Sequence, residues 1–266
     1  MKKFIALFVA LLLTVSLCAC GDTSDETTDD VQTTVSNNNA DDSADGNKGG
    51  IKTESKDEDF YAEDTDKGYY ITDYVGDAQI IRIPETLNGK TVEGISYSTF
   101  FNVQMEEVYF PSTITEIEAR TFENQLVLKK VVLNEGIKTI GDDAFINCYE
   151  LTEINIPSTV ETLGICSFAC CEKLSSIELP EGLKSIGQSC LGDTALISVT
   201  IPASVAYLGL QTVNSSDSLK DMYVLNPNAE FDPSAITECP NVVLHGAAGS
   251  TAETYALEND IPFVAE

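Results

Sequence analysis

The sequence predicts a mainly β fold, a solenoid of about seven turns in which short parallel strands stack on one another. Two observations predict it. Apolar residues recur every 22 or 23 residues over the larger, later part of the chain, a period typical of proteins built from stacked repeats. Each repeat also ends in an alternating apolar pattern, which indicates a short strand, and proline follows most of these strands.

Four columns of residues define the repeat. The first is apolar: Ile95, Ile117, Ile140, Leu163, Ile186, Leu208 and Phe231. The second follows five residues later: Phe100, Phe122, Phe145, Phe168, Leu191, Val213 and Ile236. The third lies about three residues further on: Asn102, Gln125, Cys148, Cys171, Asp193, Ser216 and Cys239. The fourth is aliphatic: Leu128, Leu151, Leu174, Leu196, Leu219 and Val242.

An alternating strand closes each repeat. Its inward residues are Val108 and Phe110, Val131 and Leu133, Ile154 and Ile156, Ile177 and Leu179, Val199 and Ile201, and Met222 and Val224. Burying the few apolar side chains of one repeat cannot offset the entropy of ordering its backbone. Each repeat must therefore share its apolar face and its strand hydrogen bonds with its neighbours, which gives parallel stacking.

Turn residues mark the corners and the ends of the stack. Glycine follows the first column at Gly141, Gly164, Gly187 and Gly209, which suits a corner that needs positive φ or a close approach. At the amino end, residues 69–74 and 79–83 flank Gly76-Asp77 and predict a hairpin cap, and Asn88-Gly89 predicts a further tight turn. At the carboxyl end, Ser250 to Glu253 form a capping-box pattern that opens a short helix to about Glu258, followed by a strand over residues 261–264.

The first 19 residues predict a lipoprotein signal peptide. An apolar run from Phe4 to Leu17 follows two lysines and is too short to span a bilayer. It ends in Leu17-Cys18-Ala19-Cys20-Gly21, which resembles a bacterial lipobox, so we expect lipidation of Cys20; the alternative is an ordinary small-residue cleavage site. This places the protein on the extracellular face of the cell membrane, held by its lipid.

Residues 20–67 predict a disordered acidic tether, because Asp, Glu, Thr, Ser, Asn and Gly dominate and apolar residues are scarce. The acidic run from Asp57 to Asp66 lacks the glycine and final glutamate of a calcium loop, and we interpret it as solvated linker. The formal charge of the chain is −28, which makes nucleic acid an improbable partner and favours basic proteins. Residues 68–266 form the predicted solenoid with its caps.

Six cysteines follow Cys20: Cys148, Cys166, Cys170, Cys171, Cys190 and Cys239. An even number in a secreted chain is compatible with disulfides. The domain is large enough to fold without them, and the spacings follow the repeat, so we expect free, buried thiols. Cys170-Cys171 has no second cysteine pair at the spacing of a zinc site, and His245 is the one histidine, so no metal or other cofactor is predicted.

The repeat around Ala144-Phe145-x-x-Cys148-x-x-Leu151 resembles that of the BspA-like, or Treponema-type, leucine-rich-repeat family. The tail from Gly246 to Phe263 also resembles the ending of many such proteins from Gram-positive gut anaerobes. The resemblance covers roughly residues 68–266 and implies a right-handed leucine-rich-repeat solenoid. Known members are mostly surface proteins credited with adhesion or protein binding, so it implies a binding role and no enzyme.

A search for chemistry in the sequence supports the same role. His245 has no nucleophile-elbow pattern around it, and Gly246-x-x-Gly249-Ser250 is better explained by turn glycines before a helix cap than by an anion site. What a solenoid offers is the outward face of its strands, where we expect the binding surface: Tyr109, Val132, Asn155, Glu178, Thr200 and Tyr223. We expect an unknown protein or envelope component as partner, or alternatively a carbohydrate or peptidoglycan; the oligomeric state stays open.

Overall fold

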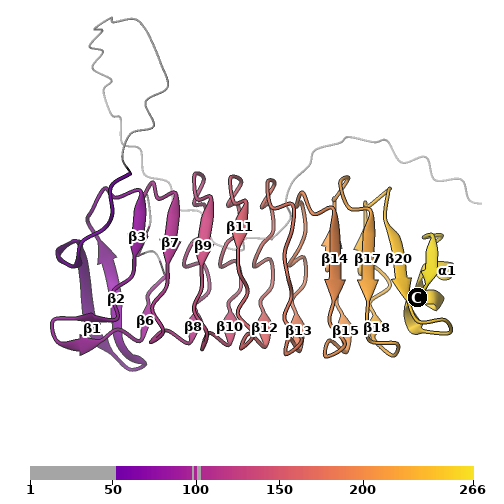
Figure 1. Ribbon diagram of the computed structural model, residues 1–266, viewed down its shortest axis with the longest axis horizontal. Coiled ribbons are helices and arrows are strands. Elements are labelled where there is room, and N and C mark those ends of the chain that lie inside the picture. The colour runs from indigo at the N-terminus through magenta and orange to yellow at the C-terminus, as the bar shows by residue number, and fades with distance from the viewer. Residues whose placement is uncertain (1–51, 98, 101–102) are drawn as a thin grey trace, which may run out of the picture. The chain divides into compact units, whose positions relative to one another are not determined.

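The computed structural model describes residues 52–97, 99–100 and 103–266, all within a compact unit that spans Lys48–Glu266. The predicted signal peptide, Cys20, residues 20–51 of the tether and Asn102 of the third column lie outside the described residues. The unit is a solenoid of about eight turns of parallel stacked strands with one short carboxyl-terminal helix, which confirms the predicted fold class (Figure 1). Among the described residues, no helix has both the length and the apolarity needed to cross a membrane.

The amino-terminal cap is a hairpin of β1 (Phe60–Thr65) and β2 (Gly68–Tyr74), preceded by the 3-10 turn η1 (Asp57–Asp59). The predicted pairing of residues 69–74 with 79–83 is wrong, because β3 (Ile80–Arg82) joins the solenoid as a parallel strand. The tether prediction is also wrong for residues 52–67, since Glu54 forms a parallel bridge with Ile80 and β1 begins at Phe60. The reason is Phe60, whose ring packs 4.9 Å from that of Tyr74 and buries the hairpin against the first turn.

One side of the solenoid carries its longest strands, and we call it the long-strand face. Two parallel sheets make it up. The first contains β3, β7 (Glu107–Tyr109), β9 (Lys130–Val132) and β11 (Glu153–Ile154). The second contains β14 (Ser198–Ile201), β17 (Asp221–Val224), β20 (Val243–Gly246) and β21 (Phe263–Ala265).

The other sides consist of two-residue strands and corners. The first column lies in β6 (Gly94–Ile95), β8 (Glu116–Ile117), β10 (Thr139–Ile140), β12 (Thr162–Leu163), β13 (Ser185–Ile186), β15 (Tyr207–Leu208) and β18 (Glu230–Phe231). In the last repeats, β16 (Val213–Asn214) pairs with β19 (Ile236–Thr237). All of these pairings are parallel and hold the repeats in register.

The predicted turn at Asn88-Gly89 and the predicted helix start at Ser250 are both confirmed. Asn88 and Gly89 have φ of 54° and 77° and join β4 (Thr86–Leu87) to β5 (Lys90–Thr91), as a two-residue hairpin requires. Helix α1 (Thr251–Glu258) begins after Ser250, whose side chain accepts a hydrogen bond from the Glu253 N–H. The last strand, β21, pairs with β20 and so covers the end of the sheet.

The second column forms the centre of the core. The rings of Phe100, Phe122, Phe145 and Phe168 stack one above another, with centroids 5.3, 5.3 and 5.6 Å apart and planes within 17° of parallel. Leu191, Val213 and Ile236 continue this column as buried side chains. Each ring contacts the ring of the next repeat, so the distance between stacked repeats also sets the distance between their phenylalanine rings.

The corner glycines are explained by close approach. A Cβ at Gly141, Gly164 or Gly187 would lie 2.7, 2.5 or 2.4 Å from backbone atoms of the preceding repeat. Positive φ occurs instead in two columns of other residues. The first column of positive φ is Arg120, Asp143, Cys166, Ser189 and Gln211, and the second is Asn124, Asn147, Cys170, Asp193, Ser215 and Glu238. Gly209 differs from the other corner glycines, since its Cβ would meet no atom closer than 3.5 Å.

Three side chains of the third column, Gln125, Cys148 and Cys171, cap the backbone of the preceding repeat. The amide of Gln125 donates to the Phe100 carbonyl at 2.8 Å, and the thiol of Cys148 donates to the Phe122 carbonyl at 3.3 Å. The assignment of Asp193 to this column is wrong. Asp193 has positive φ, and the buried residue of that repeat is Thr194. This repeat has one residue between Thr194 and Leu196, where the others have two.

The long-strand face is interrupted beside this shortened repeat. Residues 176–179, predicted as a strand, form none, and within the described part of the chain none of their four amides donates a hydrogen bond. The inward side chains are also less covered there, since Ile154 is 9% and Ile177 8% exposed, against 1% for Val131 and 2% for Val199. We attribute the interruption to the missing residue, which offsets β14 from the strand position before it.

Most of the cysteines agree with the prediction of free thiols. Cys148, Cys171 and Cys190 are free and buried, and Cys239 is free and half-buried. Burial raises the pKa of Cys148 and Cys190 to about 12. Cys166 is the exception, because it is disulfide-bonded, and the prediction of a free thiol there is wrong. It stands in a corner column of positive φ and not in a core column, so the repeat argument did not apply to it.

Candidate recognition surface

The predicted binding residues belong to one outward row on the long-strand face. Tyr109 lies beside Val132 in the first sheet, and Thr200 lies beside Tyr223 in the second. Asn155 follows β11 at the next step, and Glu178 lies in the interruption. The structure thus brings these residues into one line in two segments, with Glu178 outside any strand.

The row is longer than the sequence indicated. Arg82 lies beside Tyr109, His245 lies beside Tyr223, and Val264 lies beside His245. Arg82 and Val264 were missed because their spacings to Tyr109 and His245 depart from 22 or 23 residues. His245 keeps the period from Tyr223, so the spacing alone could have placed it in the row. The alternation of Ile81 and Ile83 around Arg82 was the signal that could have placed it on a strand of this face.

The amino end of the row is an arginine–tyrosine pair. The guanidinium carbon of Arg82 lies 4.2 Å from the centroid of the Tyr109 ring, a cation–π contact, and Arg82 pairs with Glu54 at 3.0 Å. The Tyr109 hydroxyl donates to Glu107 at 2.8 Å, and this hydrogen bond raises the pKa of Tyr109. The ring is therefore fixed from two sides and only partly exposed.

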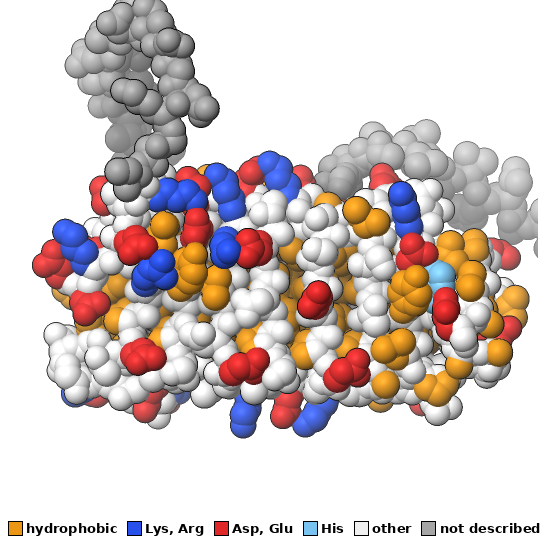
Figure 2. Space-filling view, viewed as in Figure 1, with side chains coloured by type: hydrophobic (Ala, Val, Ile, Leu, Met, Phe, Trp, Pro, Cys, Tyr) orange, Lys and Arg blue, Asp and Glu red, His pale blue; other side chains and the backbone are white. Residues whose placement is uncertain are grey.

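Around this pair lies a network of ion pairs between neighbouring turns. Lys52 pairs with Glu107 at 2.5 Å, Lys129 with Glu106 at 2.9 Å and Lys130 with Glu153 at 2.6 Å. The hydrogen bond from Lys52 lowers the pKa of Glu107. Figure 2 shows basic and acidic side chains gathered over β3, β7 and β9, with apolar side chains visible nearer the middle of the face. This end of the row presents both charges at once.

The carboxyl end of the row is a tyrosine–histidine stack. The rings of Tyr223 and His245 are 4.3 Å apart with planes 23° from parallel. His245 Nε2 lies 2.8 Å from an Asp221 oxygen, and Nδ1 lies 3.0 Å from a Glu266 oxygen. The histidine is only 8% exposed and is held at both edges, so it fixes the Tyr223 ring beside it.

The middle of the row is less available for binding. The Asn155 side chain accepts from the Leu133 N–H at 2.9 Å and donates to the Leu133 carbonyl at 2.8 Å. This amide therefore completes the backbone hydrogen bonding of the neighbouring turn. Among the described residues, Val132, Glu178 and Thr200 make no comparable side-chain contact, so the two aromatic ends are the ordered features of the face.

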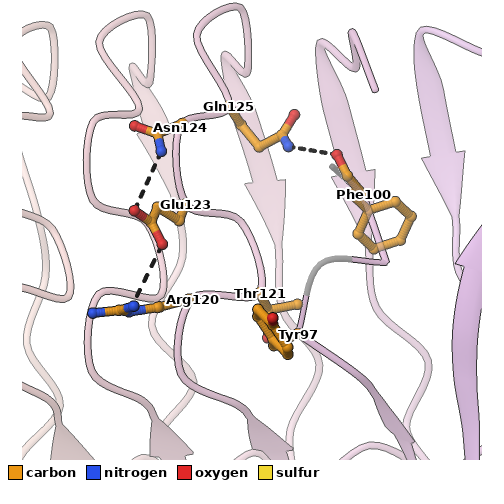
Figure 3. Close-up of a pocket in the computed structure, with 7 residues that line it drawn as sticks. All are labelled: Tyr97, Phe100, Arg120, Thr121, Glu123, Asn124 and Gln125. Carbon is orange, nitrogen blue, oxygen red and sulfur yellow. Dashed lines mark hydrogen bonds and ion pairs between the residues drawn. The ribbon is translucent and has the colours of Figure 1, made fainter. Parts of the chain in front are cut away.

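A separate pocket lies at the corner between the first two repeats (Figure 3). Its volume is about 170 Å³. Seven residues line it: Tyr97, Phe100, Arg120, Thr121, Glu123, Asn124 and Gln125. The sequence pattern did not predict this pocket. The pocket depends on Tyr97, and the equivalent position holds a different residue in each of the next repeats. In the part of the chain that the structure describes, no group of three or more His, Cys, Asp and Glu side chains could hold a metal ion.

Comparison with known families assigns the repeat. Residues 89–242, more than half of the chain, match the model of the BspA type leucine rich repeat region in six copies. The chain belongs to the BspA-type leucine-rich-repeat family. The resemblance noted from the repeat around Phe145 and Cys148 is thereby confirmed.

Solved structures of leucine-rich-repeat proteins are similar to this BspA-type chain. A leucine-rich-repeat protein of Treponema pallidum shares 24% identity over 71% of this chain and 86% of its own, with a TM-score of 0.59. A leucine-rich cell surface protein of Faecalibacterium prausnitzii shares 18% over 71% and 75%, with a TM-score of 0.41. The first likeness confirms the solenoid fold. Comparison with the curated proteins finds no match.

In a BspA-type solenoid every core position is repeated, so departures from the repeat are informative. The core columns are filled by side chains whose role is packing, as the phenylalanine stack shows. The aromatic pairs at Tyr109 and Tyr223, and the exposed Tyr97, have no such role in the core. They are therefore the candidate recognition residues of this family member.

Proposed function

We propose that this chain is a lipid-anchored surface protein that binds a protein partner through the long-strand face. The observation that carries the proposal is the pair of aromatic anchors, Tyr109 and Tyr223, at the two ends of a single row. The Arg82 guanidinium fixes the first ring and the His245 imidazole the second. Rigid tyrosines lose little entropy on binding and dominate the energy of many interfaces.

The face is suited to a protein partner because it is long and regular. Nine strand positions, counting the interruption, lie along it from β3 to β21. Stacked strands are about 4.8 Å apart, so the row extends roughly 40 Å, which is the scale of a protein–protein interface. The excess of acidic side chains over the whole chain favours a partner with a basic surface and predicts that salt weakens the association.

The partner can be tested by affinity capture from envelope fractions. We expect the wild-type chain to retain a protein that the variant Tyr109→Ala/Tyr223→Ala loses. Tyr207→Ala is the matched control, since Tyr207 is 50% exposed and stands in β15, outside the row. If the double variant retains the same protein as the control, the long-strand face is not the binding surface.

The anchor is proposed from the sequence around Cys20, and it supplies the location in which such a face would work. Expression in a bacterial host with radiolabelled fatty acid should label the wild-type chain and Cys18→Ser, which keeps the acceptor cysteine. Label should be lost in Cys20→Ser. Persistence of label in Cys20→Ser, or its absence from the wild type, would remove the anchor from the proposal.

A further inference from the structure

The pocket at Tyr97 stands apart from the long-strand face. Tyr97 occurs two residues after the first column, and the equivalent residues of the next repeats are Ala119, Asp142, Ile165, Gln188 and Leu210. Tyr97 is therefore the one aromatic residue of this column, and it is 66% exposed. An exposed tyrosine at this corner adds nothing to the core, so its role must be sought on the surface.

The floor of the pocket is rigid. Phe100 is 1% exposed and begins the phenylalanine stack, at 5.3 Å from Phe122. Thr121 is 3% exposed, and its hydroxyl donates to the Glu118 carbonyl at 2.8 Å. The Gln125 amide donates to the Phe100 carbonyl. These contacts give the pocket a fixed base, made partly of aromatic carbon, beside the Tyr97 side chain (Figure 3).

The rim is a chain of planar polar groups. Arg120 lies 3.8 Å from Glu123, and the Asn124 amide donates to the other Glu123 oxygen at 3.2 Å. The next repeat holds this chain in place, because Asp143 lies 3.3 Å from Arg120 and Asn147 donates to Asn124 at 2.8 Å. The rim thus offers a carboxylate that accepts and a guanidinium that donates, in positions set before any ligand arrives.

Charge and size narrow the ligand class. Arg120 is balanced by two carboxylates, so the rim has no net positive charge and does not suit phosphate or sulfate. At about 170 Å³ the pocket is smaller than sites for drug-sized ligands, which span roughly 300–1,000 Å³, and has room for about one ring. A pyranose combines an apolar C–H face with hydroxyls that both donate and accept, which matches a tyrosine wall and a mixed rim.

We propose that this pocket binds a single sugar ring of a glycan, with Tyr97 as the apolar wall and Glu123 and Arg120 as hydroxyl partners. Carbohydrate is the alternative ligand class that the sequence left open, and the pocket gives it a specific place. The site is independent of the long-strand face, so the protein-binding proposal can fail while this one stands, and the reverse.

The experiment is saturation-transfer difference NMR on the full chain with free galactose, mannose, N-acetylglucosamine and N-acetylneuraminic acid as probes. We expect transfer to at least one probe and a loss of affinity of about tenfold or more in Tyr97→Ala. Glu123→Gln should weaken binding less, because the amide still accepts a hydrogen bond. Tyr207→Ala, which removes an exposed tyrosine outside the pocket, should bind as the wild type does.

Two outcomes would overturn the proposal. One is the absence of transfer to all four sugars by a wild-type chain whose melting curve shows it to be folded. The other is binding that Tyr97→Ala leaves unchanged. Because Tyr97 lies largely in solvent, Tyr97→Ala should keep the wild-type melting temperature, so lost binding in a folded variant reports on the pocket itself.

Discussion

At the scale of single residues, the third column shows how far a sequence pattern can be interpreted. The spacing predicted buried, unreactive positions at Cys148 and Cys171, and the structure confirms them and adds their hydrogen bonds to the carbonyls of Phe122 and Phe145. It failed at Asp193, which lies only two residues after Leu191, whereas the buried Thr194 lies three residues after it, as in the other repeats. Counting forward from the second column gives the inward residue of this repeat, whereas counting back from Leu196 does not, because one residue fewer separates the third and fourth columns there.

The buried thiols predict a loss of stability in alkali. The pKa of Cys148 is about 12 in the folded protein, against an ordinary value of 9.0, because burial disfavours the thiolate. Between these values the unfolded chain has released a proton that the folded chain keeps, so stability falls as pH rises from about 9 towards 12. For one thiol the slope approaches about 1.4 kcal/mol per pH unit.

Urea denaturation of wild type and Cys148→Ala at pH 8 and pH 10.5, under reducing conditions, checks this. Cys148→Ala should be the less stable chain at pH 8, because it leaves a small cavity and removes the hydrogen bond to Phe122. The gap between the two should narrow at pH 10.5, since only the wild type loses stability through this thiol. Equal losses in both chains would show that Cys148 does not titrate as its burial requires.

At the scale of elements, strands and turns with a local signature were predictable and those defined by tertiary packing were not. Asn88-Gly89 and Ser250 fixed their turn and helix start by their own chemistry. The pairing of β1 with β2 escaped because the acidic residues between Asp57 and Asp66 hid a strand that Phe60 ties to the core. One buried aromatic outweighed the composition around it.

The corner glycines give a sharp test at this scale. Gly164→Ala would place a Cβ 2.5 Å from backbone atoms of Gly141 and Asp142, which cannot move without shifting a whole turn. We expect a loss of about 1–3 kcal/mol or more in the free energy of unfolding. Gly209→Ala meets nothing closer than 3.5 Å and should be neutral or stabilising by up to about 1 kcal/mol. Similar losses for both, measured by chemical denaturation, would contradict the close-approach explanation.

At the scale of the whole molecule, the repeat made the solenoid predictable but not its irregularities. The row of outward residues was predicted from Tyr109 to Tyr223, and the period could have extended it to His245, while its extension to Arg82 and Val264 required the observed registers of β3 and β21. The interruption between β11 and β14 could not be foreseen from columns that remain intact through it. We attribute it to the single residue fewer between Thr194 and Leu196.

The interruption predicts where the solenoid opens. In stacked repeats, the free energy of unfolding is close to the sum of the contributions of each repeat and of its interfaces with its neighbours. An interface without a strand ladder should therefore be less stable than the others. Residues 176–179 donate no backbone hydrogen bond to the described part of the chain, and amides without a partner exchange with solvent faster than those in a ladder. We therefore expect peptides covering 176–179 to exchange well before those of β9 and β17.

Hydrogen exchange followed by mass spectrometry measures this difference directly, and an insertion tests its cause. Placing one serine between Ala195 and Leu196 restores the spacing of the other repeats, and protection of residues 176–179 should rise towards that of β9. A serine inserted after Asn228, in an exposed turn, is the control and should leave that protection unchanged. If residues 176–179 already exchange as slowly as β9 in the wild type, the interruption is not a site of lower local stability and this prediction is wrong.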